Sequence, residues 1–164
     1  MVEIRQATIE DLNEIINIEK ECFPPAEAAQ AEDFYERYNA FKENFFVAVR
    51  EGKVVGFING CTTSSPELPD ELYHDATLHN PDGDYQTVFG LDVLPEYRKN
   101  GIASKLLNHL IKISEVRGKK GVVLTCKDYL VHYYKKFGFD HRGVSESSHG
   151  GAKWNDMVLI FEDK

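Results

Sequence analysis

The sequence predicts an α/β (α+β) fold, built on a single mixed, mostly antiparallel sheet with helices on both faces. A strand–helix–strand series over residues 85–126 predicts one parallel strand pair, joined by a right-handed crossover. The other strands are expected to be antiparallel. The clearest case is the hairpin pattern of residues 45–50 and 54–60, two apolar runs around a short turn that contains Gly52.

Length and composition are those of a soluble globular protein. A chain of 164 residues is long enough for a sizeable core, and we expect residues 1–164 to form one domain. No apolar run approaches the roughly 20 residues that cross a bilayer, and the N-terminus lacks the blocks of a signal peptide. We therefore expect a cytoplasmic protein that does not bind membranes. The formal net charge of −8 argues against nucleic-acid binding and is compatible with a cationic substrate such as an amine.

The three cysteines (Cys22, Cys61 and Cys126) are widely spaced and odd in number, so they indicate neither a disulfide framework nor a CxxC metal pair. We expect them to be small buried hydrophobic residues. The run Asp82-Gly83-Asp84 lacks the spacing and the closing glutamate of a calcium loop, and it is interpreted as a plain turn. The sequence thus predicts no metal site.

The N-terminal part alternates between strand and helix patterns. Residues 2–7 alternate apolar and polar side chains, as in a half-buried strand, and Thr8 with Asp11 resembles a capping box. The helix that follows ends before Pro24, since the residue before a proline is pushed out of the helical region. A second helix is expected over about residues 26–43. Its aromatic side chains are either a core-facing stripe or one wall of an aromatic acceptor pocket: Phe34, Tyr35, Tyr38 and Phe41.

The remaining elements follow the predicted hairpin. Residues 64–83 form the longest irregular region, and loops of this length are usually functional or mobile. After it we expect a strand (85–94), a helix (101–117), a strand (121–126), a short helix (129–137) and two strands (139–144 and 157–161) separated by a loop.

An anion site is predicted where the strand at residues 85–94 leads into its helix. The segment Arg98-Lys99-Asn100-Gly101-Ile102-Ala103 stands at a helix N-terminus, where backbone N–H groups lack partners and the helix dipole is positive. A glycine at this place removes the Cβ that would hold an anion away. The sequence therefore predicts phosphate binding here.

Two motifs resemble those of a known family. Val93-x-Pro95-x-x-Arg98-x-x-Gly101-x-Ala103 resembles the acetyl-CoA-binding signature of the GNAT N-acetyltransferases. Tyr133-Tyr134-Lys135-Lys136-Phe137-Gly138-Phe139 resembles the second conserved block of that family, in the right order and with a strand between the two. Within the superfamily, residues 77–83 and 124–134 are most similar to segments of the serotonin (arylalkylamine) N-acetyltransferases.

The resemblance implies the GNAT fold and acetyl-CoA or CoA as cosubstrate, without a metal. It implies that the main chain of Leu91, Asp92 and Val93 pairs with the pantetheine arm and the acetyl group. It implies that backbone N–H groups of Arg98, Lys99, Asn100, Gly101, Ile102, Ala103 and Ser104 surround the pyrophosphate. Tyr134 would be the catalytic general acid toward the departing thiolate, a step that a nearby hydroxyl can assist. A strand N–H would stabilise the oxyanion that forms during amine attack on the thioester.

The sequence departs from the family where a base is expected. Thr87 and Phe89 stand at the positions of two histidines in the serotonin enzymes, and neither can be a base near neutral pH. The base is left open among His74, His79, Asp84, His132, His149, a water chain and bulk solvent. Strand alternation is expected to put the Asp92 side chain on the face opposite Thr87, Phe89 and Leu91, which leaves it a main-chain role. Lys127 replaces an asparagine of many relatives, so a cofactor contact there is also open.

The expected activity is acetyl transfer from acetyl-CoA to a primary amine, most simply a small (aryl)alkylamine, by direct transfer in a ternary complex. The aromatic side chains of Phe34, Tyr35, Tyr38 and Phe89 could build an apolar slot for such an amine, or they could equally be core. One alternative is a protein N-terminus or lysine as acceptor. Another is a CoA-binding regulatory module without turnover. Many relatives form homodimers, and since no stretch of this sequence demands one, the oligomeric state is left open.

Overall fold

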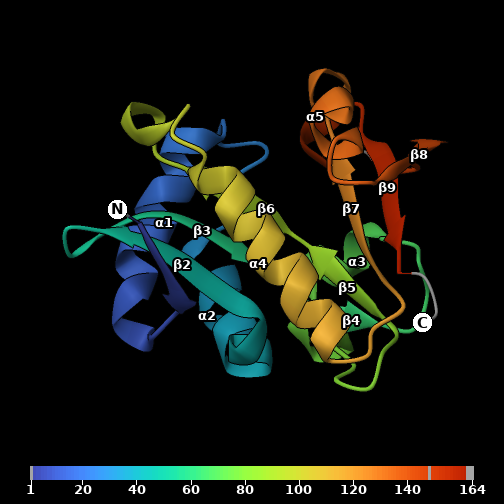
Figure 1. Cartoon of the computed structure of the whole chain (residues 1–164), viewed down its shortest axis with the longest axis horizontal. Helices are drawn as coiled ribbons and strands as arrows, with labels where there is room; N and C mark the ends of the chain where they lie inside the picture. The colour runs from blue at the N-terminus through green and yellow to red at the C-terminus, as the bar shows by residue number, and fades with distance from the viewer. Residues whose placement is uncertain (1, 148, 162–164) are drawn as a thin grey trace.

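The computed structural model describes residues 2–147 and 149–161, and its strands form two sheets (Figure 1). The first sheet is antiparallel, in the order β1 (Glu3–Gln6), β2 (Phe45–Arg50), β3 (Lys53–Asn59) and β6 (Gly90–Val93). The second has the order β4 (Thr62–Thr63), β5 (Tyr85–Val88), β7 (Gly121–Cys126), β9 (Asn155–Ile160) and β8 (Asp140–Val144). The predicted parallel pair is confirmed as β5 with β7, while the other described pairs are antiparallel.

The prediction of a single sheet is corrected by a break in the strand expected at residues 85–94. The Phe89 N–H donates to the Asn59 carbonyl over 2.7 Å, and the next residue, Gly90, has the same asparagine as its register partner. Two residues of one strand thus face one residue of the other, which is a β-bulge, and a bulge bends and twists its strand. The strand before it, β5, pairs with β7, whereas β6 after it pairs with β3.

Helices cover both faces of the first sheet, as predicted. α1 (Leu12–Cys22) and α2 (Ala31–Phe41) pack on one face, where Leu12, Ile15 and Phe34 meet Phe57 of β3 in a common core. The long helix α4 (Ile102–Val116) crosses the other face (Figure 1). Its leucines pack with side chains of β2, β3 and β7: Leu106, Leu107 and Leu110.

Short helices complete the chain. They are α3 (Asp70–His74) and α5 (Val131–Lys135), and the 3-10 turns η1 (Ile9–Asp11), η2 (Lys42–Asn44), η3 (Ala76–Leu78), η4 (Pro95–Tyr97), η5 (Asp128–Leu130) and η6 (His149–Gly151). The helix expected at residues 26–43 begins later than predicted. The carbonyl of Pro24 accepts the N–H groups of Glu27 and Ala28, and this separate turn precedes α2. None of the helices in the described residues is long and apolar enough to cross a membrane.

The capping box predicted at Thr8 is present. The Thr8 N–H donates to Asp11 Oδ2 over 2.7 Å, and the guanidinium of Arg5 donates to both carboxylate oxygens of Asp11 over 2.7 and 3.0 Å. The irregular region 64–83 is more ordered than predicted, because it contains α3 and η3. It is tied to α2 where the Arg37 guanidinium donates to the Tyr73 carbonyl over 3.0 Å.

Candidate active site

Beyond the bulge, β6 and β7 separate, and one edge of β6 has no strand partner in the described part of the chain (Figure 1). The Leu94 N–H donates to the Val55 carbonyl of β3 over 2.9 Å. In an antiparallel pair, the main-chain N–H and C=O groups of every second residue point toward the same neighbouring strand. The main-chain groups of Asp92, two residues before Leu94, therefore also point toward β3. Those of Leu91 and Val93 therefore point toward the open edge.

The loop that follows β6 leads into a helix N-terminus with free donors. The backbone N–H groups of residues 99–104 donate to no other described residue. Lys99 and Gly101 have positive φ angles of 68° and 76°, and a Cβ added at Gly101 would meet nothing within 4 Å. The glycine thus provides both a left-handed backbone and open space at the positive end of α4. This geometry fits the anion site that the sequence predicts.

Two side chains of this loop are held by neighbours. The Arg98 guanidinium donates through Nε to the Val93 carbonyl over 3.0 Å, and the half-buried Cys22 thiol lies 3.4 Å from the same oxygen. Arg98 is thus turned back toward β6. The hydroxyls of Ser104 and Tyr133 lie 3.1 Å apart, which links α4 to α5. The loop 98–104 and the edge of β6 therefore form one continuous surface.

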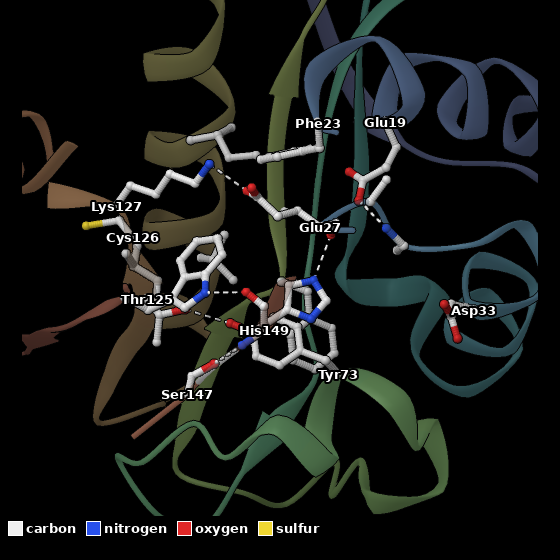
Figure 2. A pocket seen from close by; sticks show the side chains of 18 of the residues that line it. Glu19, Phe23, Glu27, Asp33, Tyr73, Thr125, Cys126, Lys127, Ser147 and His149 are labelled. Atoms are coloured by element: carbon white, nitrogen blue, oxygen red, sulfur yellow. Dashed lines mark hydrogen bonds and ion pairs between the residues drawn. The ribbon is translucent and has the colours of Figure 1, made fainter. Parts of the chain in front are cut away.

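A cavity of about 450 Å³ adjoins this surface (Figure 2). Its walls come from residues 88–91 around the bulge, residues 124–127 of β7, the segment 23–30 between α1 and α2, and the C-terminal loop. The two sides are tied across the cavity by Glu27: its carboxylate pairs with Lys127 over 2.6 Å, and its carbonyl accepts from His149 Nε2 over 2.7 Å (Figure 2). The cavity is thus bridged on one side and is bounded by main chain of β6. The sequence left open whether Lys127 contacts the cofactor, and in the structure Lys127 is paired with Glu27.

Tyr134 lies where the cavity meets the β6–β7 gap. Its side chain is buried and lines the cavity, and its hydroxyl has no hydrogen-bond partner among the described residues. Burial, assisted by the nearby Cys126 thiol, raises the pKa of Tyr134 above its ordinary value. The hydroxyl therefore stays protonated and can act as a donor.

The aromatic stripe of α2, which the sequence left open between the core and a pocket wall, does not line the cavity. Phe34 and Phe41 are fully buried, with the Phe34 ring 5.7 Å from that of Phe57 in the core, and Tyr35 is 41% exposed. Tyr38 packs against the same core. The face of α2 toward the cavity is instead polar and carries Asp33 and Arg37. Phe34, Tyr38 and Phe41 thus belong to the core, whereas Tyr35 is exposed.

Aromatic side chains do line the cavity, but most come from other segments: Phe23, Tyr73, Phe89, Tyr129 and Trp154. Of the aromatic residues proposed from sequence, Phe89 alone is in this set. The Tyr73 hydroxyl lies 2.9 Å from Thr125 Oγ1, and burial raises the pKa of Tyr73 to about 12. The indole N–H of Trp154 donates to the His149 carbonyl over 2.9 Å. These residues lie on loops and on α3, where no periodic pattern assigns an orientation to a side chain.

Two of the five proposed bases line the cavity, His74 and His149. His149 uses one ring nitrogen on the Glu27 carbonyl. His79 is buried elsewhere and accepts the Thr62 N–H over 3.0 Å, and burial lowers the pKa of His79. His132 is exposed, and Asp84 pairs with a surface lysine, Lys120, over 3.5 Å.

Carboxylates that sequence reasoning did not propose line the cavity: Glu19, Glu27, Glu32 and Asp33. Glu19 is only 6% exposed, and its Oε2 accepts the Ala29 N–H over 2.7 Å (Figure 2). A signal for it was present, because Glu19 continues the apolar helix face of Leu12, Ile15 and Ile16. No group of three or more His, Cys, Asp or Glu side chains in the described residues is arranged to hold a metal ion.

The expected orientation of Asp92 is wrong. Asp92 pairs with Phe57 in register and so shares the α1 and α2 face of the sheet, where Phe89 also packs. The extra residue of the bulge shifts the alternation by one position and brings the two side chains to one face. Asp92 is buried, and neither carboxylate oxygen has a hydrogen-bond partner among the described residues. Burial and the carboxylate of Glu19 raise the pKa of Asp92 well above its usual range.

Relatives of known sequence point to one family. The chain is 30% identical over 122 residues to an uncharacterized N-acetyltransferase, YkwB, of Bacillus subtilis, which covers 68% of this chain and 54% of that protein. It is 32% identical over 108 residues to the serotonin N-acetyltransferase of Mesocricetus auratus (65% and 51%). It is 28% identical over 165 residues to an N-alpha-acetyltransferase of Sulfolobus acidocaldarius (96% and 90%). The chain thus spans about half the length of the first two relatives.

Solved structures share the fold at low identity. The loading GNATL domain of CurA from Lyngbya majuscula matches with a TM-score of 0.85 at 17% identity, over 98% of each chain. The PaiA N-acetyltransferase of Thermoplasma acidophilum, in complex with coenzyme A, matches with a TM-score of 0.71 at 19% identity, over 98% of this chain and 99% of that one. The model of the acetyltransferase (GNAT) family matches residues 12–139, which is most of the chain. The chain therefore belongs to the acetyltransferase (GNAT) family.

Proposed function

We propose that residues 1–164 form one N-acetyltransferase domain that moves the acetyl group of acetyl-CoA directly to the primary amine of a small (aryl)alkylamine. The observation that carries the proposal is the cavity, which has aromatic and acidic walls and adjoins both the open edge of β6 and Tyr134. A volume of about 450 Å³ lies in the range of small-molecule sites. Aromatic rings suit an aryl group, and carboxylates suit an ammonium group.

Acetyl-CoA would be held mainly by main-chain groups. The fit rests on the unpartnered N–H groups of residues 99–104 and on the open space at Gly101. We assign the pyrophosphate to Arg98, Lys99, Asn100, Gly101, Ile102, Ala103 and Ser104. The pantetheine arm would lie along residues 91–93, where Leu91 and Val93 offer outward groups and Asp92 lies between them.

Each protein group then has a definite task. When bound, acetyl-CoA supplies a thioester carbon that an amine can attack. An N–H on the open edge of β6 stabilises the carbonyl oxygen as negative charge develops on it. The Tyr134 hydroxyl donates its proton to the departing sulfur. Phe89 and Trp154 hold the acceptor so that its nitrogen faces the β6 edge.

A protein N-terminus or lysine is the second candidate acceptor, because one relative is an N-alpha-acetyltransferase. Such an acceptor needs an open, extended groove. In this chain Glu27 bridges the cavity through its contacts with Lys127 and His149. This bridging favours a small acceptor over a peptide.

The test is incubation with acetyl-CoA and a panel of tryptamine, phenylethylamine and polyamines, followed by thiol release and mass spectrometry of the amines. We expect acetylated arylalkylamine. A peptide library run in parallel detects the second candidate. Acetylated peptide without acetylated small amine would overturn the proposed acceptor. Tight acetyl-CoA binding in calorimetry, with no product from either panel, would indicate a binding module instead of an enzyme.

A further inference from the structure

Two buried acids at or near the cavity have no part in the tasks above. Glu19 on α1 faces the cavity. Asp92 is outside the cavity lining, on the face of β6 that α1 covers, and both of its carboxylate oxygens are unpartnered among the described residues. Two ionised carboxylates cannot satisfy each other, whereas a carboxylic acid can donate to a carboxylate. A protonated Asp92 would therefore be a donor for the Glu19 carboxyl group.

We propose that Glu19 is the catalytic proton acceptor for the incoming amine and that Asp92 is the residue that positions it, an inference that rests on the proposed function. The contacts of Glu19 and the burial of Asp92 indicate which of the two residues has which role. Its Oε2 accepts the Ala29 N–H, which holds the side chain toward the cavity (Figure 2). Burial favours the protonated form of Asp92, whose pKa is raised, so in the proposed pair Asp92 is the hydrogen-bond donor and the Glu19 carboxyl group is the acceptor.

The charged groups around Glu19 agree with this division. The Arg37 guanidinium of α2 is buried and attracts both acids of the pair, while Asp33 faces the cavity from the same helix. The Cys22 thiol lies one turn further along α1, where burial, which outweighs the contacts with Arg98, raises its pKa, so it adds no charge. Glu27, from the segment after α1, is paired with Lys127. Of the other two carboxylates of the cavity, Glu32 is exposed and Asp33 accepts the Gln30 N–H over 2.9 Å, so Glu19 is the buried carboxyl group that faces the cavity.

The proton balance is complete without a further reactant. Glu19 takes one proton from the ammonium group, and the free nitrogen forms the N–C bond as the C–S bond breaks. Sulfur receives the proton of Tyr134, and the proton that nitrogen then loses restores the tyrosine. The sum is an amide, a thiol and one proton that Glu19 returns to solvent. This assignment fills the role that Thr87 and Phe89 cannot fill.

The experiment compares Glu19→Gln with Glu21→Gln, the same change on an exposed residue of the same helix outside the cavity. Each variant is assayed with a basic alkylamine and with an O-alkylhydroxylamine, whose nitrogen is neutral at pH 7. For the alkylamine, we expect E19Q to lower kcat/KM by about 10²-fold, a usual contribution of a general base. For the neutral amine we expect E19Q to change kcat/KM little, because no proton needs removal before attack. E21Q should match the wild type with both.

The role of Asp92 is tested by Asp92→Leu and Asp92→Asn, which have similar shapes. Loss of the donor in D92L disfavours the carboxylate form of its neighbour, so the acid limb of the pH profile of kcat/KM moves to higher pH. The amide N–H of D92N restores a donor and should return most of that shift. Thermal unfolding and acetyl-CoA calorimetry check that each variant is folded.

The outcomes separate the two proposals. Wild-type protein that acetylates neither amine would overturn the proposed function and this inference with it. Wild-type turnover combined with an equal loss of E19Q activity on both amines would overturn the inference alone. Identical acid limbs in wild type, D92L and D92N would remove the positioning role of Asp92.

Discussion

The two sides of the proposed site, called here the cofactor side and the acceptor side, are built in different ways. The cofactor side is a continuous segment, the open edge of β6 followed by the loop 98–104, and its contacts are main-chain groups. The acceptor side gathers side chains from at least five separate segments around one cavity. A short motif therefore encodes the first, whereas the second exists only once the chain has folded. Substitutions should divide along the same line, with changes in one side leaving the KM of the other substrate nearly unchanged.

The largest effect is expected at Tyr134, where the two sides meet. Tyr134→Phe removes the proton donor and should lower kcat by about 10²-fold, with little change in either KM, because the ring still fills its buried place. Steady-state kinetics in both substrates measures this, with Tyr35→Phe on the exposed face of α2 as the control. An unchanged kcat would remove the acid role from Tyr134.

Gly101→Ala tests whether the loop 98–104 binds acetyl-CoA. The matched control is Gly118→Ala: the two glycines have φ angles of 76° and 78°, and a Cβ at either would meet nothing within 4 Å. Both variants should lose about 1 kcal/mol of folding stability from the left-handed backbone. G101A alone should also raise the KM for acetyl-CoA, by about tenfold if one main-chain contact is lost. Equal KM values in the two variants would show that this loop does not hold the cofactor.

The acceptor half is tested by Phe89→Leu against Phe34→Leu. Sequence reasoning put both rings in one possible pocket, and the structure separates them: Phe89 lines the cavity beside Tyr73 and Arg37, while Phe34 is core. F89L should raise the KM for an arylalkylamine several-fold, as expected for loss of part of an apolar contact. F34L should lower the melting temperature and leave that KM unchanged. A raised KM in F34L together with an unchanged KM in F89L would indicate that the aromatic acceptor pocket lies on α2 instead.

The same contrast explains how far the sequence could predict the molecule. The element order, the parallel pair and the loop 98–104 follow from periodicity and from one contiguous motif. The division into two sheets does not, because the bulge at Phe89 depends on its pairing with Asn59, a residue about 30 positions earlier. The error on Asp92 follows from the same bulge. Glu19 could have been found, since an acid on the apolar face of a helix needs a reason to be there.

Trp154 and His149 could not have been assigned to the site in this way. They lie in a loop of small and polar residues near the C-terminus, and their place beside Tyr73 and Glu27 comes from tertiary contacts alone. A pattern of period 2 or 3.6 orients side chains only within regular elements. Prediction from sequence is thus less accurate for loops than for strands and helices, and most of the proposed acceptor wall lies in loops.

The smallest effect on activity is expected at Asp11, which is far along the chain from the loop 98–104 and does not line the cavity. Its substitution gives the reference for a change in stability alone. Asp11→Ala removes the acceptor of the Thr8 N–H and of Arg5, and should cost about 1–2 kcal/mol of folding free energy. Partial burial acts to raise the pKa of Asp11, but hydrogen bonds from Arg5 and Thr8 outweigh it and hold the pKa below its usual value. The unfolded chain therefore binds the proton more readily, so this contribution is complete above the unfolded-state pKa and is lost as the pH falls through the folded-state pKa. Urea unfolding of wild type and D11A from neutral to acidic pH should show two curves that converge, with both KM values unchanged at pH 7; a constant gap would mean that the charge of Asp11 contributes nothing.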